Sequence, residues 1–176
     1  MFNNAGVLAE SKPEVTVNAN LLGCIYGTEI ASTHMRKDRG GKGGRIINMS
    51  SKAGLTDLPN VPTYCATKHG VRTYTISKSN HPSVEDTGVE YAVLFPGCVL
   101  AGLYLKLIED RIAKQGKPSV ARNEYLEIPL SRLLDGFLKL VTLEKMNGAM
   151  LEVTPDEDLF VRMEKVVIGS TYPPSL

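Results

Sequence analysis

Tyr64 and Lys68 are the two residues of this chain whose types and spacing point most directly to chemistry. Residues four apart on a helix lie on one face, so these side chains would lie one above the other if a helix begins at Asn60 or Thr63. A free phenol has a pKa of about 10, and a nearby cation favours its anionic form. Lys68 could therefore prepare Tyr64 to act as a general base. Two surface residues of an ordinary helix would show the same spacing.

The residues before this predicted helix suggest a ligand site. The run from Gly44 to Ser51 predicts a buried strand that ends in two hydroxyls, and a loop rich in Gly, Pro and Asn follows it. A serine at the carboxyl end of a parallel strand lies where open α/β sheets bind ligands. Two further motifs flank this region, Asn3-Asn4-Ala5-Gly6 upstream and Phe95-Pro96-Gly97 downstream.

In this order and at these separations, the four motifs resemble those of the classical short-chain dehydrogenase/reductase family. The resemblance covers residues 2 to about 155. It implies a Rossmann-like, doubly wound parallel α/β sheet for residues 1–155 and a variable tail at 156–176. The segments Asn48–Ser51 and Tyr64–Gly70 look most like the branch of prostaglandin-oxidising and insect alcohol-oxidising enzymes.

The resemblance also implies roles for individual residues. Tyr64 would be the proton-transferring base, and Lys68 would lower the pKa of Tyr64 and bond the ribose. Ser51 would hold the substrate oxygen, and it is preferred to Ser50 because its separation from Tyr64 fits the family. Asn20 matches an asparagine that distorts its helix and holds a water, with a purely structural buried amide as the alternative. Cofactor contacts are implied for Asn4, Ala5, Gly6, Tyr64, Lys68, Pro96, Gly97 and Val99.

The start of the chain departs from the family pattern. In that family, three strands and a Gly-rich phosphate-binding turn precede the Asn-Asn-Ala-Gly motif, and we find neither ahead of Asn3. The glycines of 40–44 precede a strand rather than follow one, so we interpret them as a helix-to-strand connection. We therefore expect an incomplete, N-terminally truncated sheet. Ala101 also stands where the family usually has a threonine near the cofactor.

Two functions follow from the resemblance. The first is NAD-dependent oxidation of a secondary hydroxyl to a ketone, with a hydroxylated fatty acid or prostaglandin as the implied substrate and NADP as the other possible cofactor. The second is an inactive truncated form that pairs with a full-length partner. Family members dimerise through two long helices, which implies a homodimer.

Composition sets the remaining bounds. A chain of 176 residues with 43% hydrophobic and 22% charged residues fits one globular domain. A net charge of +1 gives no reason to expect nucleic acid as a partner. Three cysteines without metal-ligand spacing predict no metal site and favour a reducing, cytoplasmic setting. The chain has no run of eighteen apolar residues, so we expect no membrane span.

Hydrophobic patterns predict the other elements. A helix is expected from Pro13 to about Arg36, buried on more than one side. The segments 88–95 and 148–153 predict strands, and 102–125 predicts a solvated amphipathic helix. The family resemblance implies that 102–125 is the mobile segment that covers the substrate. Loop 52–63 would form an apolar pocket wall with Leu55, Leu58 and Val61. A helix over 131–143 would point Leu133, Leu134, Phe137, Leu138 and Val141 inward.

Overall fold

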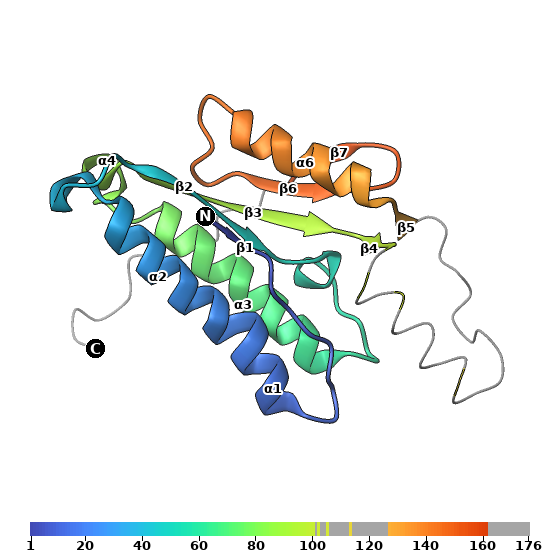
Figure 1. The fold of residues 1–176 in the computed structure, drawn as a ribbon. Helices are drawn as coiled ribbons and strands as arrows, with labels where there is room; N and C mark the ends of the chain where they lie inside the picture. Colours follow the sequence, from blue (N-terminus) through green and yellow to red (C-terminus); the bar gives the residue numbers. More distant parts are fainter. Residues whose placement is uncertain (101, 103–104, 106–112, 114–126, 162–176) are drawn as a thin grey trace, which may run out of the picture.

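A five-stranded sheet forms the centre of the computed structural model, which describes residues 1–100, 102, 105, 113 and 127–161 (Figure 1). The strand order is β1-β2-β3-β6-β7, and every pair is parallel except β6 with β7. The predicted α/β class with a mostly parallel sheet is therefore confirmed. The strands are β1 (Phe2–Asn3), β2 (Gly44–Met49), β3 (Val89–Pro96), β6 (Met150–Val153) and β7 (Asp158–Phe160). A separate parallel pair joins β4 (Cys98–Val99) to β5 (Glu127–Ile128).

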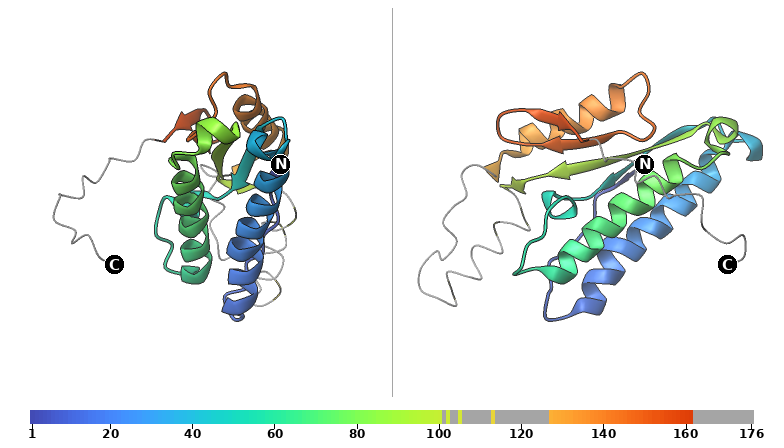
Figure 2. Two further views of the ribbon diagram at one scale, coloured as in Figure 1. Left: turned by 90° about the vertical axis from the view of Figure 1, so that its left-hand side faces the viewer. Right: turned by 180° about the vertical axis from the view of Figure 1, so that it is seen from behind.

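Helices cover both faces of the sheet (Figure 2). On one face, α1 (Pro13–Val17), a π-helical turn (Asn18–Leu22) and α2 (Gly23–Met35) run on from one another beside α3 (Pro62–Ser79). On the other face lies α6 (Leu130–Thr142). Shorter turns are the 3₁₀ segments Lys37–Arg39 and Lys52–Gly54, and α4 (Val84–Thr87).

The core is divided by the sheet. The larger cluster lies on the α6 side, where Leu94, Leu140 and Leu151 are fully buried. Phe2 of β1 packs against this cluster and stacks on Phe137 of α6, with ring centroids 4.6 Å apart. These contacts attach the first strand to the rest of the domain.

A buried polar network ties the strands to the helices on the opposite face. Asn48 of β2 is fully buried, and its Oδ1 accepts from Asn3 Nδ2 at 2.7 Å and from Thr28 Oγ1 at 3.2 Å. Its Nδ2 donates to Thr75 Oγ1 at 2.9 Å. One amide thus joins β1, β2, α2 and α3, through two hydrogen bonds to its oxygen and one from its nitrogen.

Two of the predicted helix faces are wrong. The buried face of α2 carries Cys24, Thr28 and Ser32, whereas Tyr26 and Ile30 are exposed. Small residues are needed on the inner face because the helix lies so close to β1 that a Cβ at Gly27 would clash with the Asn3 side chain. In α6, Leu133 and Phe137 pack inward as predicted, but three other predicted core residues are exposed: Leu134, Leu138 and Val141.

The end of the described chain adds a strand that the sequence did not predict. β7 pairs antiparallel with β6, and Asp158 on β7 forms ion pairs with Arg132 and Lys139 of α6. The first residues of the predicted variable tail are therefore part of the sheet. The division of the chain at residue 155 stays a prediction.

Candidate active site

The motifs found in the sequence meet at one edge of the sheet. Because β1, β2 and β3 are parallel, the residues after each strand emerge on the same side. Asn4, Ala5 and Gly6 follow β1, Ser50 and Ser51 follow β2, and Pro96, Gly97 and Val99 lie at and after the end of β3. Helix α3 brings Tyr64 and Lys68 to these strands. Ala101 and most of 102–125 lie outside the described residues.

Tyr64 and Lys68 are stacked on one face of α3 as their spacing predicts. Lys68 Nζ lies 5.5 Å from the centroid of the Tyr64 ring. Lys68 is 3% exposed, and its ammonium donates to Met49 O at 3.0 Å. An ammonium has three donors, so Lys68 has further hydrogen bonds to offer a ligand.

Burial changes the pKa values of both residues. It lowers the pKa of Lys68 to about 8. It also raises the pKa of Tyr64, against a hydrogen bond from Ser51 that acts in the opposite direction. Burial is the largest cause of the shift, so the pKa of Tyr64 is raised in this structure. The lowering of this pKa by Lys68 together with a bound nicotinamide stays a prediction.

Ser50 and Ser51 have different surroundings. Ser50 is buried, and its Oγ donates to Lys68 O at 2.8 Å. Ser51 is half-buried, accepts a hydrogen bond from Ala53 N at 3.2 Å, and lies near enough to the Tyr64 phenol to act against the rise of its pKa. The geometry therefore favours Ser51 over Ser50 as a partner of a substrate oxygen next to Tyr64.

Asn20 lies in the π-helical turn, so a local distortion is present at the residue where it was expected. The side chain is held by protein atoms. Its Oδ1 accepts from Val7 N at 2.7 Å, and its Nδ2 donates to Val7 O at 2.9 Å and to Thr67 Oγ1 at 3.3 Å. These bonds give the side chain a structural role, and the water expected at Asn20 stays a prediction.

The residues present fit the nicotinamide and ribose end of a dinucleotide. Asn4, Ala5 and Gly6 are exposed at the strand edge. A Cβ at Gly6 would lie 3.6 Å from Lys68 Nζ and 3.2 Å from Asn20 Oδ1, so a side chain there would approach the lysine. The glycine leaves room in front of a buried cation, as a ribose hydroxyl would require.

Sequence reasoning missed Glu10. Its carboxylate accepts two backbone hydrogen bonds at the start of α3, from Thr63 N at 3.0 Å and from Tyr64 N at 2.8 Å. Burial works to raise the pKa of Glu10, but these bonds outweigh it and the pKa is lowered. No local pattern signals this contact, because Glu10 and its partners are more than fifty residues apart.

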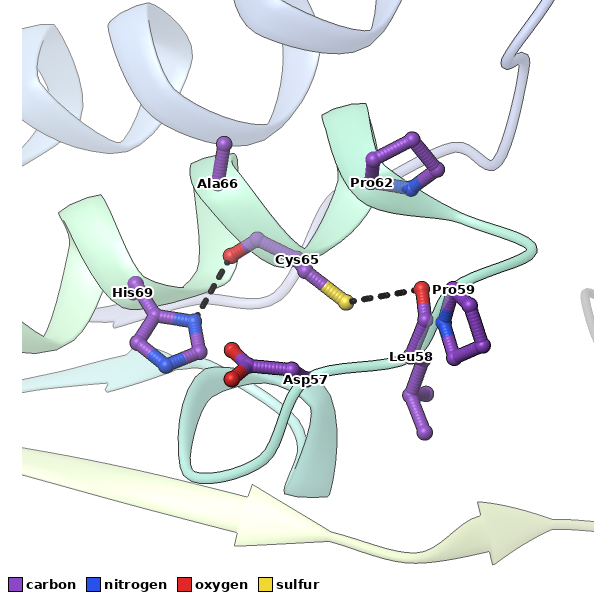
Figure 3. Close-up of a pocket in the computed structure, with 7 residues that line it drawn as sticks. All are labelled: Asp57, Leu58, Pro59, Pro62, Cys65, Ala66 and His69. Atoms are coloured by element: carbon purple, nitrogen blue, oxygen red, sulfur yellow. Dashed lines mark hydrogen bonds between the residues drawn. The ribbon is translucent and has the colours of Figure 1, made fainter.

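A hollow of about 420 Å³ lies between the loop at 57–62 and α3 (Figure 3). Cys65 Sγ donates to Leu58 O at 3.8 Å across it, while Leu55 packs against the core. Leu58 lines this hollow, and the apolar wall of a substrate pocket formed by Leu55, Leu58 and Val61 stays a prediction. None of the four candidate catalytic residues lines the hollow, whose lining is Asp57, Leu58, Pro59, Pro62, Cys65, Ala66 and His69.

Within the described residues, no group of three or more His, Cys, Asp or Glu side chains is arranged to hold a metal ion. In the same part of the chain, no helix is long and apolar enough to cross a membrane.

Comparison with known proteins identifies the class. The family model for short chain dehydrogenases matches residues 1–111. The chain therefore belongs to the short-chain dehydrogenase family, an oxidoreductase family that uses NAD or NADP.

The similar proteins include two kinds of dehydrogenase. The chain is 32% identical to 15-hydroxyprostaglandin dehydrogenase [NAD(+)] of Mus musculus over 164 residues, which cover 90% of this chain and 61% of the relative. It is 38% identical to alcohol dehydrogenase 1 of Ceratitis capitata over 97 residues, or 55% of this chain and 38% of the relative. The chain thus spans about three fifths of the length of the prostaglandin dehydrogenase that it matches.

A solved structure shares the fold. The structure titled ElxO with NADP bound matches with a TM-score of 0.67 at 23% identity, covering 86% of this chain and 64% of that chain.

Proposed function

We propose that this protein oxidises a secondary hydroxyl to a ketone with a nicotinamide dinucleotide. The observation that carries the proposal is the meeting of Tyr64, Lys68 and Ser51 at the carboxyl ends of β2 and its parallel neighbours. A phenol, a buried ammonium and a hydroxyl at such an edge suit proton transfer to and from an alcohol oxygen.

Each residue has one task in the oxidative direction. Ser51 hydrogen-bonds the substrate oxygen and orients the hydroxyl toward Tyr64. The O–H bond breaks and its proton passes to Tyr64, while the C–H bond breaks and a C=O double bond forms. When bound, the oxidised nicotinamide supplies the hydride acceptor and a positive charge beside the site. Lys68 bonds the ribose and stabilises the phenolate of Tyr64.

Burial makes the phenolate hard to form without further positive charge. The pKa of Tyr64 is raised, and the pKa of Lys68 is lowered to about 8, so Lys68 keeps its proton at neutral pH. A cation in the cleft would lower the pKa of Tyr64 and favour its role as a base. The unliganded protein thus holds Tyr64 protonated.

The relatives support a finer proposal on cofactor and substrate. NAD is proposed because the prostaglandin dehydrogenases that the chain resembles carry NAD(+) in their names, whereas the structure of ElxO holds NADP. The same relatives support a hydroxylated fatty acid or prostaglandin as the substrate.

The proposal includes a homodimer through α2 and α3 in the cytoplasm. Tyr26 and Ile30 support this interface because they are 61% and 62% exposed on the outer face of α2. Sedimentation of the purified protein, compared with a Tyr26→Lys, Ile30→Lys double variant, tests it. A variant that sediments like the wild type would contradict this interface.

A turnover assay tests the function. The purified protein is offered hydroxylated fatty acids and prostaglandins with NAD or NADP, and ketone formation is followed. Tyr64→Phe should lower kcat by about 10²-fold or more because proton transfer loses its base. Tyr74→Phe is the matched control, since Tyr74 lies on the same helix and donates to Glu29 at the surface. Equal turnover by the wild type and Tyr64→Phe would contradict the mechanism.

A further inference from the structure

The helix that carries Tyr64 has no cap in its own sequence. α3 begins at Pro62, and the N-cap residue, Val61, makes no side-chain bond to the helix. The expectation that Asn60 or Thr63 opens the helix is therefore wrong. The first N–H groups of any helix lack partners within the helix, so they need acceptors from elsewhere.

Glu10 supplies these acceptors from a distant part of the chain. Its Oε2 accepts from Thr63 N at 3.0 Å, and its Oε1 accepts from Tyr64 N at 2.8 Å. Bonds from backbone N–H groups to a carboxylate are stronger than neutral ones, and the positive end of the helix dipole strengthens them further. Because each oxygen binds a different N–H, the carboxylate fixes the orientation of the first turn as well as its position.

The same segment also holds the carbonyl side of Tyr64. Tyr64 O accepts from Thr67 Oγ1 at 2.8 Å, and Thr67 Oγ1 accepts from Asn20 Nδ2 at 3.3 Å. Asn20 in turn bonds both the N–H and the carbonyl of Val7. The segment from Val7 to Glu10 therefore reaches the backbone of Tyr64 from both sides. This segment follows directly after Asn4, Ala5 and Gly6 at the strand edge.

We propose that Glu10 is a positioning residue: its carboxylate fixes the backbone of Tyr64 so that the phenol meets Ser51 and the substrate oxygen. This inference rests on the proposed function. A small displacement of a reacting group can lower the reaction rate by a large factor. Because Glu10 holds the backbone of Tyr64 itself, its loss should affect the rate more than the stability of the protein. An 18-residue helix with many other contacts would persist without it.

The kinetic test uses Glu10 variants in two backgrounds. Glu10→Ala should lower kcat about tenfold with a small change in KM, whereas Glu10→Gln, which keeps one acceptor, should lose about threefold. In the Tyr64→Phe background, Glu10→Ala should cause no further loss, because a residue that acts through Tyr64 has nothing left to position. Glu14→Gln, a nearby charge removal at the start of α1, is the matched control. An equal loss in both backgrounds, or no loss with Tyr64 present, would overturn the proposal.

A second measurement is independent of turnover. In the wild type, the Thr63 and Tyr64 amides should exchange slowly with solvent, and Glu10→Ala should speed this exchange at least tenfold and shift the NMR signals of the Tyr64 ring. Glu14→Gln should leave both unchanged. If the wild type shows no turnover with any alcohol while the Tyr64 ring signals respond to Glu10→Ala, the proposed function fails and the positioning role stands. Ring signals that do not respond would overturn the positioning role.

Discussion

Lys68 lies directly beneath Tyr64, with its ammonium 5.5 Å from the centre of the phenol ring and bonded to Met49 O at 3.0 Å. The lysine is buried as completely as an apolar core residue. Among the residues that the structure describes, no carboxylate pairs with Lys68. Burial of such a cation costs free energy, which the lowered pKa of about 8 reflects. In the proposed mechanism, the same ammonium bonds the ribose of the dinucleotide.

The buried Lys68 should give the protein an alkaline increase in stability. Folded Lys68 releases its proton near pH 8, whereas unfolded Lys68 keeps it until about pH 10.5. Between these values the unfolded state binds more protons, so the free energy of unfolding should rise with pH. Relative to Lys68→Met, the wild type should gain on the order of 3 kcal/mol over this range.

Urea unfolding of the wild type and of Lys68→Met at several alkaline pH values measures this gain. The tyrosines with raised pKa values are present in both proteins, so they change the two free energies of unfolding alike. Lys42→Met, which removes an exposed lysine, is the control and should follow the wild type. Parallel stability curves for the wild type and Lys68→Met would show that Lys68 keeps its ordinary pKa.

Ser51 and Ser50 should respond differently to replacement by alanine. Ser51→Ala removes the hydroxyl beside Tyr64 that would hold the substrate oxygen, so kcat/KM should fall about 10²-fold with little change in stability. Ser50→Ala removes the bond to Lys68 O and should cost about 1 kcal/mol of stability with a smaller effect on rate. Steady-state kinetics and thermal unfolding of the two variants separate these effects, and the reverse assignment of the losses would identify Ser50 as the substrate partner.

Asn48 should be among the residues most important for stability. Asn48→Ala removes the partners of Asn3, Thr28 and Thr75 at a fully buried point, so the free energy of unfolding should fall by about 3 kcal/mol. Asn60→Ala, on an exposed loop, should change it by less than about 0.5 kcal/mol. Chemical denaturation measures both, and similar values for the two variants would mean that the network contributes little.

Much of the site could be predicted because it is encoded locally. The pairing of Tyr64 with Lys68 follows from a helical spacing of four, and the position of Ser51 follows from an apolar run that ends in hydroxyls. Parallel strand pairing then brings the separate motifs to one edge.

The features that were missed depend on contacts between distant segments. Glu10 reaches residues more than fifty positions away, and no local pattern predicts such a cap. The direction of the Tyr64 pKa depends on how deeply the packed domain buries the phenol, which the sequence does not state. The exposed Tyr26 and Leu138 look like core residues by type, because hydrophobic spacing does not show which face of a helix meets the sheet.

Isothermal titration of the folded protein with NAD tests whether this strand edge binds the cofactor. NAD should bind saturably, and Lys68→Met should weaken the binding at least tenfold because the ammonium proposed to bond the ribose is lost. Lys42→Met should leave the affinity unchanged. Titration with NADP under the same conditions tests the cofactor preference. A folded wild type that binds neither dinucleotide, or one that binds as tightly after Lys68→Met as before, would contradict the assignment of this strand edge as the site of nicotinamide chemistry.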